Sequence, residues 1–459
     1  MPPTPSHPVI RPRWSGERGT VLIVTLLVLS LLALGAGSYL SLNLNTSRQA
    51  RQSYRQNASF HLAEAGAEEA VWSLNRATAQ AGDAWTDWTR SGPAAWRKFT
   101  GFDFGGDTRG SVKVYVSNAS PAGNDKPSAV AQAVVEASGY PPSTRMIEIT
   151  LGRRSYFASG IVAKEALRFA GLNTLVDSWD SDPDANPATP PVPYDEAVRS
   201  DRGSIATMAV VNNAMLVNQA TVWGYVATGG AAPEVGVNGS IRGKDTPEGM
   251  QIDPARVTTD FSADLPLLTA PLDGTPLLSV GETLGTEGQA TKWRCPGITL
   301  RSEQTLTILG DVTLVLTTSV GSALDVTGNA AIILAENSSL TVYVEGDLKI
   351  AGKGIANPNT QPRTCRIFGT GAAQAIQVAG NGDLKTVIYA PNAEVSLNGN
   401  GNIMGAVVGR SVTITGNARF HYDESLARGG EDTPFGVTRW RELTSAADRQ
   451  TWASVFAGW

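Results

Sequence analysis

The chain has 459 residues, a formal net charge of −5 and 48 glycines, but only three histidines and two cysteines. This length exceeds one typical domain, so we expect two or three folding units. The lysines and arginines are scattered, which argues against the clustered basic face of a nucleic-acid-binding protein. The few cysteines and distant histidines lack the ligand spacing of a zinc site, and nothing in the sequence calls for a cofactor.

The first notable segment is residues 19–47, which carry no charge and follow Arg18 directly. Its centre is almost purely aliphatic, and a helix of roughly 20 such residues spans a bilayer core of about 30 Å. Arg11 and Arg13 also precede it, as the positive-inside rule predicts for a single-pass anchor with the bulk of the chain outside the cytoplasm. We therefore expect insertion in the inner membrane.

Three interpretations compete for this segment. A cleaved secretory signal has an apolar stretch of about 7–15 residues; this one is longer, although the sequence LGAG at 34–37 would suit a signal peptidase. An uncleaved anchor fits the length and charge, but it does not explain the polar, helix-like continuation from Arg48. The third interpretation is a prepilin-type segment, cut between Gly19 and Thr20 so that the apolar helix becomes the new N-terminus.

Two stretches carry a family resemblance, RGTVLIVTLL at 18–27 and FHLAEAGAE at 60–68. Together they resemble the N-terminus of PilX-type minor pilins of type IV pilus assembly, and related pseudopilins of type II secretion share the pattern. The resemblance covers roughly residues 14–76. It implies cleavage by a prepilin peptidase after Gly19 and assembly with other pilin-like subunits through the N-terminal helix.

One position departs from the usual pilin pattern. Most pilins carry Glu five residues after the cut, whereas this chain has Val24. A charged residue inside a membrane helix is costly unless it is paired, and in stacked pilins the partner would be a neighbour's new amino terminus. A subunit without the Glu is tolerated best at the end of the stack, so the departure favours a minor or tip subunit.

The sequence after the helix predicts a mainly β chain. Alternating strands at 111–116 and 145–151 flank another at 129–140, which indicates a small antiparallel pilin-like unit. The expected organisation is therefore a leader at 1–19, a transmembrane and amphipathic helix at 20–76, pilin-like strands at 77–152, a β-solenoid-like domain at 153–430, and a C-terminal helical cap on that domain at 431–459.

The solenoid expectation comes from short β runs at 312–350 and 376–414. They recur every 7 to 11 residues or so and are separated by Gly and Asn. Three strands per coil would give a repeat of about 25 residues, compatible with a parallel β-solenoid. A β-sandwich with hairpins at the same turns is the alternative.

Two clusters are candidates for metal binding or catalysis. His421 is the one histidine closely followed by two carboxylates, but no nucleophile motif accompanies it, and a structural histidine is the simpler interpretation. The oxygen ligands at Asp182, Asp184 and Asn186 begin like a calcium loop. Pro187 stands where the sharp-turn Gly belongs, so calcium is a weak candidate, and a solvated Asx-turn loop is the alternative.

The remaining candidates are pairs. Cys295 and Cys365 would form a disulfide in an oxidising compartment if their Cα atoms lay within reach; two separate buried thiols are the alternative. Because β-solenoids also include polysaccharide-cleaving enzymes, carboxylate pairs deserve consideration. The available carboxylates are Asp325, Glu336, Glu345, Asp347, Asp383 and Glu394. No pattern in the sequence brings two of them to a shared site, so we expect no enzymatic activity.

The sequence thus predicts a minor pilin-like subunit, incorporated at or near the tip of a type IV pilus or pseudopilus. It would reside in the inner membrane before assembly and at the cell surface afterwards. Its β-rich domain would serve adhesion or assembly, contacting surfaces, glycans or other cells. The alternative is a membrane-tethered cell-envelope β-solenoid that binds or cleaves polysaccharide.

Overall fold

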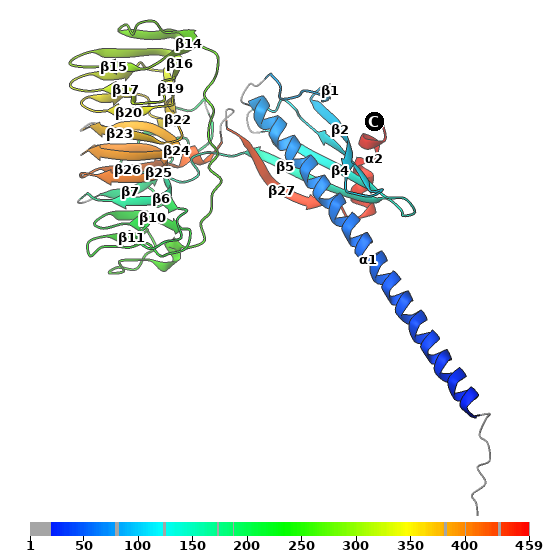
Figure 1. The fold of residues 1–459 in the computed structure, drawn as a ribbon. Helices are drawn as coiled ribbons and strands as arrows, with labels where there is room; N and C mark the ends of the chain where they lie inside the picture. The colour runs from blue at the N-terminus through cyan, green and yellow to red at the C-terminus, as the bar shows by residue number, and fades with distance from the viewer. Residues whose placement is uncertain are drawn as a thin grey trace, which may run out of the picture. The chain divides into compact units, whose positions relative to one another are not determined.

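The computed structural model describes residues 20–78, 82–122, 125–171, 174–186, 188–380, 383–399, 401–429 and 433–458. The chain divides into two compact units, a first unit of Met1–Gly152 with Phe435–Trp459 and a second unit of Arg153–Pro434. The expectation of a mainly β chain with a long N-terminal helix is confirmed (Figure 1). The expected leader, with Gly19, lies outside the described residues.

The N-terminal helix α1 (Thr20–Thr78) is continuous over 59 residues. At 1.5 Å per residue this corresponds to about 90 Å. Its apolar half has a mean hydropathy of 2.5 over an 18-residue window, and no part of that window is buried. Among the described residues, α1 is the one helix long and apolar enough to cross a membrane.

The distal half of α1 packs on an antiparallel sheet. The buried positions share one face of the helix, because they are spaced by three or four residues, except for one adjacent pair: Ala58, Leu62, Ala63, Ala67, Ala70 and Leu74. Four strands follow one another as antiparallel neighbours, in agreement with the expected meander, and a short strand extends the edge. They are β1 (Thr89–Ser91), β2 (Ala94–Asp103), β3 (Arg109–Val116), β4 (Ser128–Glu136) and β5 (Ser143–Arg153).

The close approach of helix and sheet explains the small residues of the AEAG stretch. A Cβ added to Gly66 would lie 2.7 Å from Val112 Cγ2 and 3.1 Å from Ala131 Cβ. Both distances are shorter than ordinary carbon–carbon contacts. Glycine at this position therefore lets α1 lie directly against β3 and β4.

The C-terminal segment differs from the expected cap on the β-rich domain. Strand β27 (Phe435–Glu442) joins the first unit's sheet beside β5, and helix α2 (Ala446–Ala457) follows it. Phe456 of α2 packs with Val130 and Met146 of the same sheet. The amphipathic tail buries its apolar side on the first unit, so residues 435–457 complete that unit.

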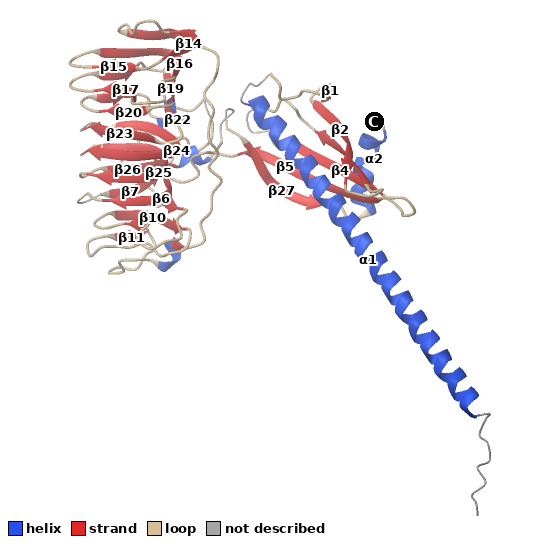
Figure 2. Cartoon of the chain, in the orientation of Figure 1, coloured by secondary structure: helices blue, strands red, loops and turns tan. Residues whose placement is uncertain are grey.

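The strands of the second unit lie in stacked coils (Figure 2). The named strand pairs of this unit are parallel, and parallel strands cannot be joined by the short hairpins expected of a β-sandwich. The first set of strands is β6 (Ile161–Phe169), β7 (Leu175–Trp179), β8 (Gly203–Thr207), β9 (Met215–Leu216), β10 (Thr221–Thr228), β11 (Ser240–Arg242) and β12 (Val257–Thr258).

The second set runs from β13 to β26, with two short 3₁₀ helices. Its members are β13 (Thr275–Pro276), β14 (Thr283–Cys295), β15 (Ile298–Leu300), β16 (Thr305–Leu316), β17 (Ser322–Val326), β18 (Ala331–Leu334), β19 (Ser339–Val344), β20 (Asp347–Ile350), β21 (Gly354–Ala356), η2 (Pro362–Thr364), β22 (Cys365–Gly369), β23 (Gln374–Gly380), β24 (Leu384–Gly399), β25 (Asn402–Thr415), β26 (Arg419–Asp423) and η3 (Glu424–Ala427). A further 3₁₀ helix, η1 (Pro254–Arg256), precedes β12.

Aliphatic columns form the core of the second unit. Because paired parallel strands place equivalent residues side by side, one inward position is repeated from coil to coil. One column runs, in order, through Leu314, Val342, Ile367, Ile388, Val407, Ile161, Ile205 and Val226. Each member is at most 2% exposed. The apolar runs separated by Gly and Asn are the sequence signature of this column.

The order of the coils in space differs from their order in the chain. Strand β6 pairs on one side with β25 and on the other with β8 and β9. The chain thus enters the stack in its middle, builds coils toward β11 and β12, returns through residues 259–282 and builds back from β14 to β26 (Figure 1). We call residues 259–282 the return segment.

The two ends of the second unit meet. The Arg154 amide donates to the Pro434 carbonyl oxygen at 2.7 Å, and Arg153 Nη1 donates to the Thr433 carbonyl oxygen at 2.8 Å. The second unit is therefore an insertion between β5 and β27 whose entry and exit are hydrogen-bonded to each other.

Candidate functional site

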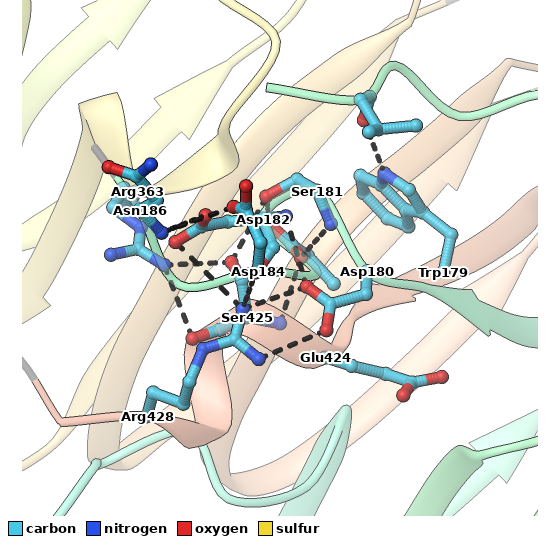
Figure 3. A network of polar contacts seen from close by, with 12 residues as sticks. Trp179, Asp180, Ser181, Asp182, Asp184, Asn186, Arg363, Glu424, Ser425 and Arg428 are labelled. Carbon is cyan, nitrogen blue, oxygen red and sulfur yellow. Dashed lines mark hydrogen bonds and ion pairs between the residues drawn. The ribbon is translucent and has the colours of Figure 1, made fainter. Parts of the chain in front are cut away.

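A polar cluster of the second unit joins β7, the loop after it, and the segment from β26 to Arg428 (Figure 3). In the loop, Asp182 Oδ1 accepts the Asn186 amide at 3.2 Å, and Asp184 Oδ1 accepts the same amide at 3.1 Å. Asp184 also accepts the Thr189 hydroxyl at 3.0 Å. The Asp184–Asn186 bond is an Asx turn, and the other two bonds also stay within the loop, so these oxygens of the calcium candidate bind groups of the loop itself.

No group of three His, Cys, Asp or Glu side chains able to hold a metal ion occurs among the described residues. Pro187, the position that weakened the calcium interpretation, lies outside them. Of the two interpretations, the geometry of Asp182, Asp184 and Asn186 therefore favours the Asx-turn loop.

An ion pair fixes this loop to the exit of the second unit. Arg428 Nη1 and Nη2 donate to the two carboxylate oxygens of Asp180 at 3.0 and 2.8 Å, a bidentate arrangement (Figure 3). Burial raises the pKa of Asp180, but the bonds from Arg428 and from the Asp182 amide outweigh it, and the pKa lies below its usual value. The carboxylate is thus held in its charged form.

A histidine–carboxylate pair lies beside this loop. His421 Nδ1 is 2.5 Å from Asp177 Oδ1, and both side chains are at most 1% exposed. The Tyr194 hydroxyl donates to Asp177 Oδ2 at 2.8 Å, and its ring stacks on the His421 ring with centroids 3.7 Å apart. Burial, followed by the charge of Asp177, raises the pKa of Tyr194. The structure therefore covers His421 with the loop.

The outer nitrogen of His421 faces an amide. His421 Nε2 is 3.2 Å from Asn402 Oδ1, whereas general-base catalysis needs a nucleophile within hydrogen-bond reach of that nitrogen. The two carboxylates that follow it serve other partners: Glu424 accepts the Ser178 hydroxyl at 2.9 Å, and Asp423 binds Ser181. The arrangement is that of a histidine satisfied within the core.

Asp423 is the centre of a second buried network. Its Oδ1 accepts the amides of Ser181 and Ser425, both at 3.0 Å, and its Oδ2 accepts the Ser181 hydroxyl at 2.7 Å. Burial raises the pKa of Asp423, against the lowering effect of these bonds. Arg363 Nη2 in turn donates to two oxygens of Ser425, the hydroxyl oxygen at 2.7 Å and the carbonyl oxygen at 3.2 Å. The network thus ends on an arginine.

The carboxylates considered for polysaccharide cleavage contact partners in different coils. Asp325 pairs with Arg301, and Glu394 pairs with Arg410. Asp383 accepts the Asn402 side-chain amide at 3.0 Å, and Asp347 accepts the Ala375 amide at 2.8 Å. Neither Glu336 nor Glu345 joins one of these contacts, so the described geometry brings no two of the six into a shared polar cluster.

The disulfide candidate is wrong, because Cys295 and Cys365 are both free and buried. Cys295 is at the end of β14 and Cys365 at the start of β22, with β16 and β19 between those strands. Three strand spacings of about 4.8 Å separate the cysteines by roughly 14 Å along the stack alone. Disulfides need Cα atoms within about 7 Å.

Comparison with known proteins gives limited matches. Residues 297–429 match a family described as a domain of unknown function, DUF7305. This match spans β15 to η3 and includes Arg363, His421 and Arg428. No curated protein matches the chain. The crystal structure of the competence-associated pilin ComZ from Thermus thermophilus is similar at a TM-score of 0.20 with 12% identity, covering 84% of this chain and 96% of that chain. A TM-score this low does not establish a common fold.

Sequence reasoning missed several residues of these networks. Arg363 and Ser425 are 62 positions apart, and Arg428 and Asp180 are 248 apart. Tyr194 had no signal beyond its place in a proline-rich loop. Only the coil order, with β26 beside β7, brings these segments together.

Proposed function

We propose that this protein is a PilX-type minor pilin-like subunit, cut after Gly19 by a prepilin peptidase and incorporated through α1 at or near the tip of a type IV pilus or pseudopilus. Before assembly it is held in the inner membrane by the same helix. The second unit, which we interpret as a β-solenoid, is presented at the cell surface for adhesion or assembly.

The main support for this proposal is that the two halves of α1 differ in burial. The half that begins at Val21 exposes its aliphatic side chains, such as Leu22 and Leu29, which are 65% and 62% exposed. The half that begins near Arg55 is packed on an antiparallel sheet. A continuous helix of this kind exposes an apolar surface suited first to lipid and then to neighbouring apolar helices.

The polar sites support a non-catalytic role in this proposal. His421 Nε2 meets an amide oxygen rather than a nucleophile. Fold alone does not imply activity, so we propose a structural and binding function for the second unit. The alternative, a tethered envelope protein that binds polysaccharide, would keep residues 1–19 and remain in the bilayer.

Intact-mass measurement of the native protein tests the proposal. We expect loss of residues 1–19 and recovery of the processed chain in sheared surface appendages. Gly19→Phe should block processing because a bulky side chain does not fit a site that accepts glycine, and Gly19→Ala is the matched small control. A full-length N-terminus in mature cells, or normal processing of Gly19→Phe, would refute it.

A further inference from the structure

A cavity of about 110 Å³ lies within the second unit, where residues 155–157, the return segment, β19, β22, residues 426–428 and Thr433 meet. This volume holds several water molecules or one small ring. Its walls combine arginines with aromatic side chains, and no Asp or Glu is among the described residues that line it. The residues that define it are Tyr156, Tyr343, Arg363, Arg366, Phe368 and Arg428.

The three arginines are not equivalent. Arg428 is neutralised by its bidentate pair with Asp180. Arg363 donates through Nη2 to the hydroxyl and carbonyl oxygens of Ser425, both of which are uncharged. Among the described residues, Arg363 forms no ion pair, and its Nε is buried without a hydrogen-bond partner. A guanidinium whose described hydrogen bonds go to neutral oxygens keeps its preference for an anionic partner, because charge-assisted bonds are stronger than neutral ones.

The buried network described above holds Arg363 in place. Asp423 fixes Ser425 through its amide, and the Ser181 and Ser425 hydroxyl oxygens are 3.0 Å apart. Ser425 is 0% exposed. The Arg363 carbonyl oxygen also accepts a hydrogen bond from Arg366 Nε at 2.8 Å, which ties the Arg366 guanidinium to the Arg363 backbone. Pre-positioned guanidinium groups are the preferred partners of planar carboxylates.

The aromatic walls indicate what carries the carboxylate. The rings of Tyr343 and Phe368 lie 5.2 Å apart at 45°, and Tyr156 lies 4.6 Å from Tyr389. Flat apolar faces with polar tips suit a ring that has C–H faces and hydroxyl edges. We propose that this cavity binds the carboxylate-bearing ring of an acidic sugar, a uronate, with Arg363 as the principal carboxylate donor. This inference depends on the proposed function only for where the protein would meet such a sugar, namely at the cell surface.

Calorimetric titration of the full chain in detergent tests this inference. D-glucuronate should bind, and D-glucose, which has the same ring without the carboxylate, should bind at least about tenfold more weakly, because hydrogen bonds to charged groups contribute about 1.5–3 kcal/mol. Equal affinity for the two sugars, or no glucuronate binding, would overturn the proposal. Inorganic phosphate that binds as tightly as glucuronate would overturn the assignment to a sugar.

Variants locate the site. Arg363→Gln should lose glucuronate affinity by about tenfold or more, and Arg363→Lys should retain part of it. Arg301→Gln is the matched control, since Arg301 is 68% exposed and pairs with Asp325 in another coil. Unchanged binding by a folded Arg363→Gln protein contradicts the proposal. If that variant does not fold, Arg363→Lys and the two-sugar comparison decide.

A uronate oligosaccharide distinguishes the source of the ligand. Tighter binding than the monosaccharide supports a site for a polymer, and equal binding supports a site for a single ring or chain end. Neither measurement requires cleavage or assembly. A protein that binds glucuronate yet keeps residues 1–19 would retain this inference and lose the pilin proposal.

Discussion

The two units differ in the size of the residues at their closest packing contacts. In the first, a single helix lies so close to its sheet that Gly66 has no room for a Cβ atom. In the second, columns of large aliphatic residues fill the interior, and Ile388 is fully buried between Ile367 and Val407. The contact between α1 and its sheet therefore needs a small residue, whereas the column of the second unit needs large ones. A larger residue should destabilise the first site, and a smaller residue should destabilise the second.

The largest expected effect is a cavity in the aliphatic column. Ile388→Ala should destabilise the second unit by about 3 kcal/mol, because it removes buried methyl groups and leaves a void. Hydrogen exchange measured by mass spectrometry should show the loss in β22, β24 and β25, while α1 stays protected. Ile333→Ala is the control, since Ile333 is 37% exposed. Equal losses for the two variants would contradict the column's role.

The reverse substitution sharpens the comparison. Gly66→Leu should destabilise the first unit by about 2 kcal/mol, because overpacking forces α1 away from β3 and β4. Hydrogen exchange should increase in those elements and remain unchanged in the second unit. Gly37→Leu is matched for chemistry on the same helix, where a Cβ meets nothing within 4 Å. A protected α1–β3 contact in Gly66→Leu would show that the close approach is not needed.

A smaller, pH-dependent effect is expected at the loop. The lowered pKa of Asp180 means that its pair with Arg428 stabilises the fold above the unfolded pKa near 3.8 and that this contribution disappears as pH falls through the lower folded value. Arg428→Gln should cost about 1 kcal/mol at pH 7, allowing for partial exposure, and less at pH 3, which lies below the unfolded value. Denaturant titration at both pH values checks this.

The control for that experiment is Arg202→Gln. Arg202 is 73% exposed and pairs with Glu424 at 3.3 Å, so its loss should change stability little at either pH. A stability difference for Arg428→Gln that persists unchanged at pH 3 would contradict the role assigned to the Asp180 carboxylate.

The smallest expected effect concerns the cysteines. Because Cys295 and Cys365 are free, a reducing agent should change neither the mass nor the stability of the protein. Burial raises the pKa of Cys365 to about 11, so the native protein should react slowly with thiol reagents at pH 8 and rapidly once unfolded. A mass increase of about 2 Da on reduction would reveal a bond and contradict the strand order.

Local patterns predicted much of this structure. The alternation at 111–116 and 145–151 gave β3 and β5, and the regular apolar runs gave β16–β20 and β23–β25. These signals depend only on neighbours in sequence, because pleat and periodicity are local properties.

What remained hidden depends on non-local pairing. The sequence of residues 435–442 does not indicate that they pair beside β5. The sequence of β6 likewise does not indicate that this strand pairs with β25. The tail's apolar side was recognised, but its partner was not. The same limit applies to Arg363, whose setting is made by segments that the coil order alone brings together.

The hydrogen-bonded junction of Arg154 and Pro434 has an evolutionary consequence. Since the chain leaves the stack beside the point where it enters, coils can be gained or lost at either end without moving those two connections. The inserted second unit can therefore change in length, or be exchanged for another domain, while the first unit keeps its sequence. This topology therefore lets the second unit change at a different pace from the first unit.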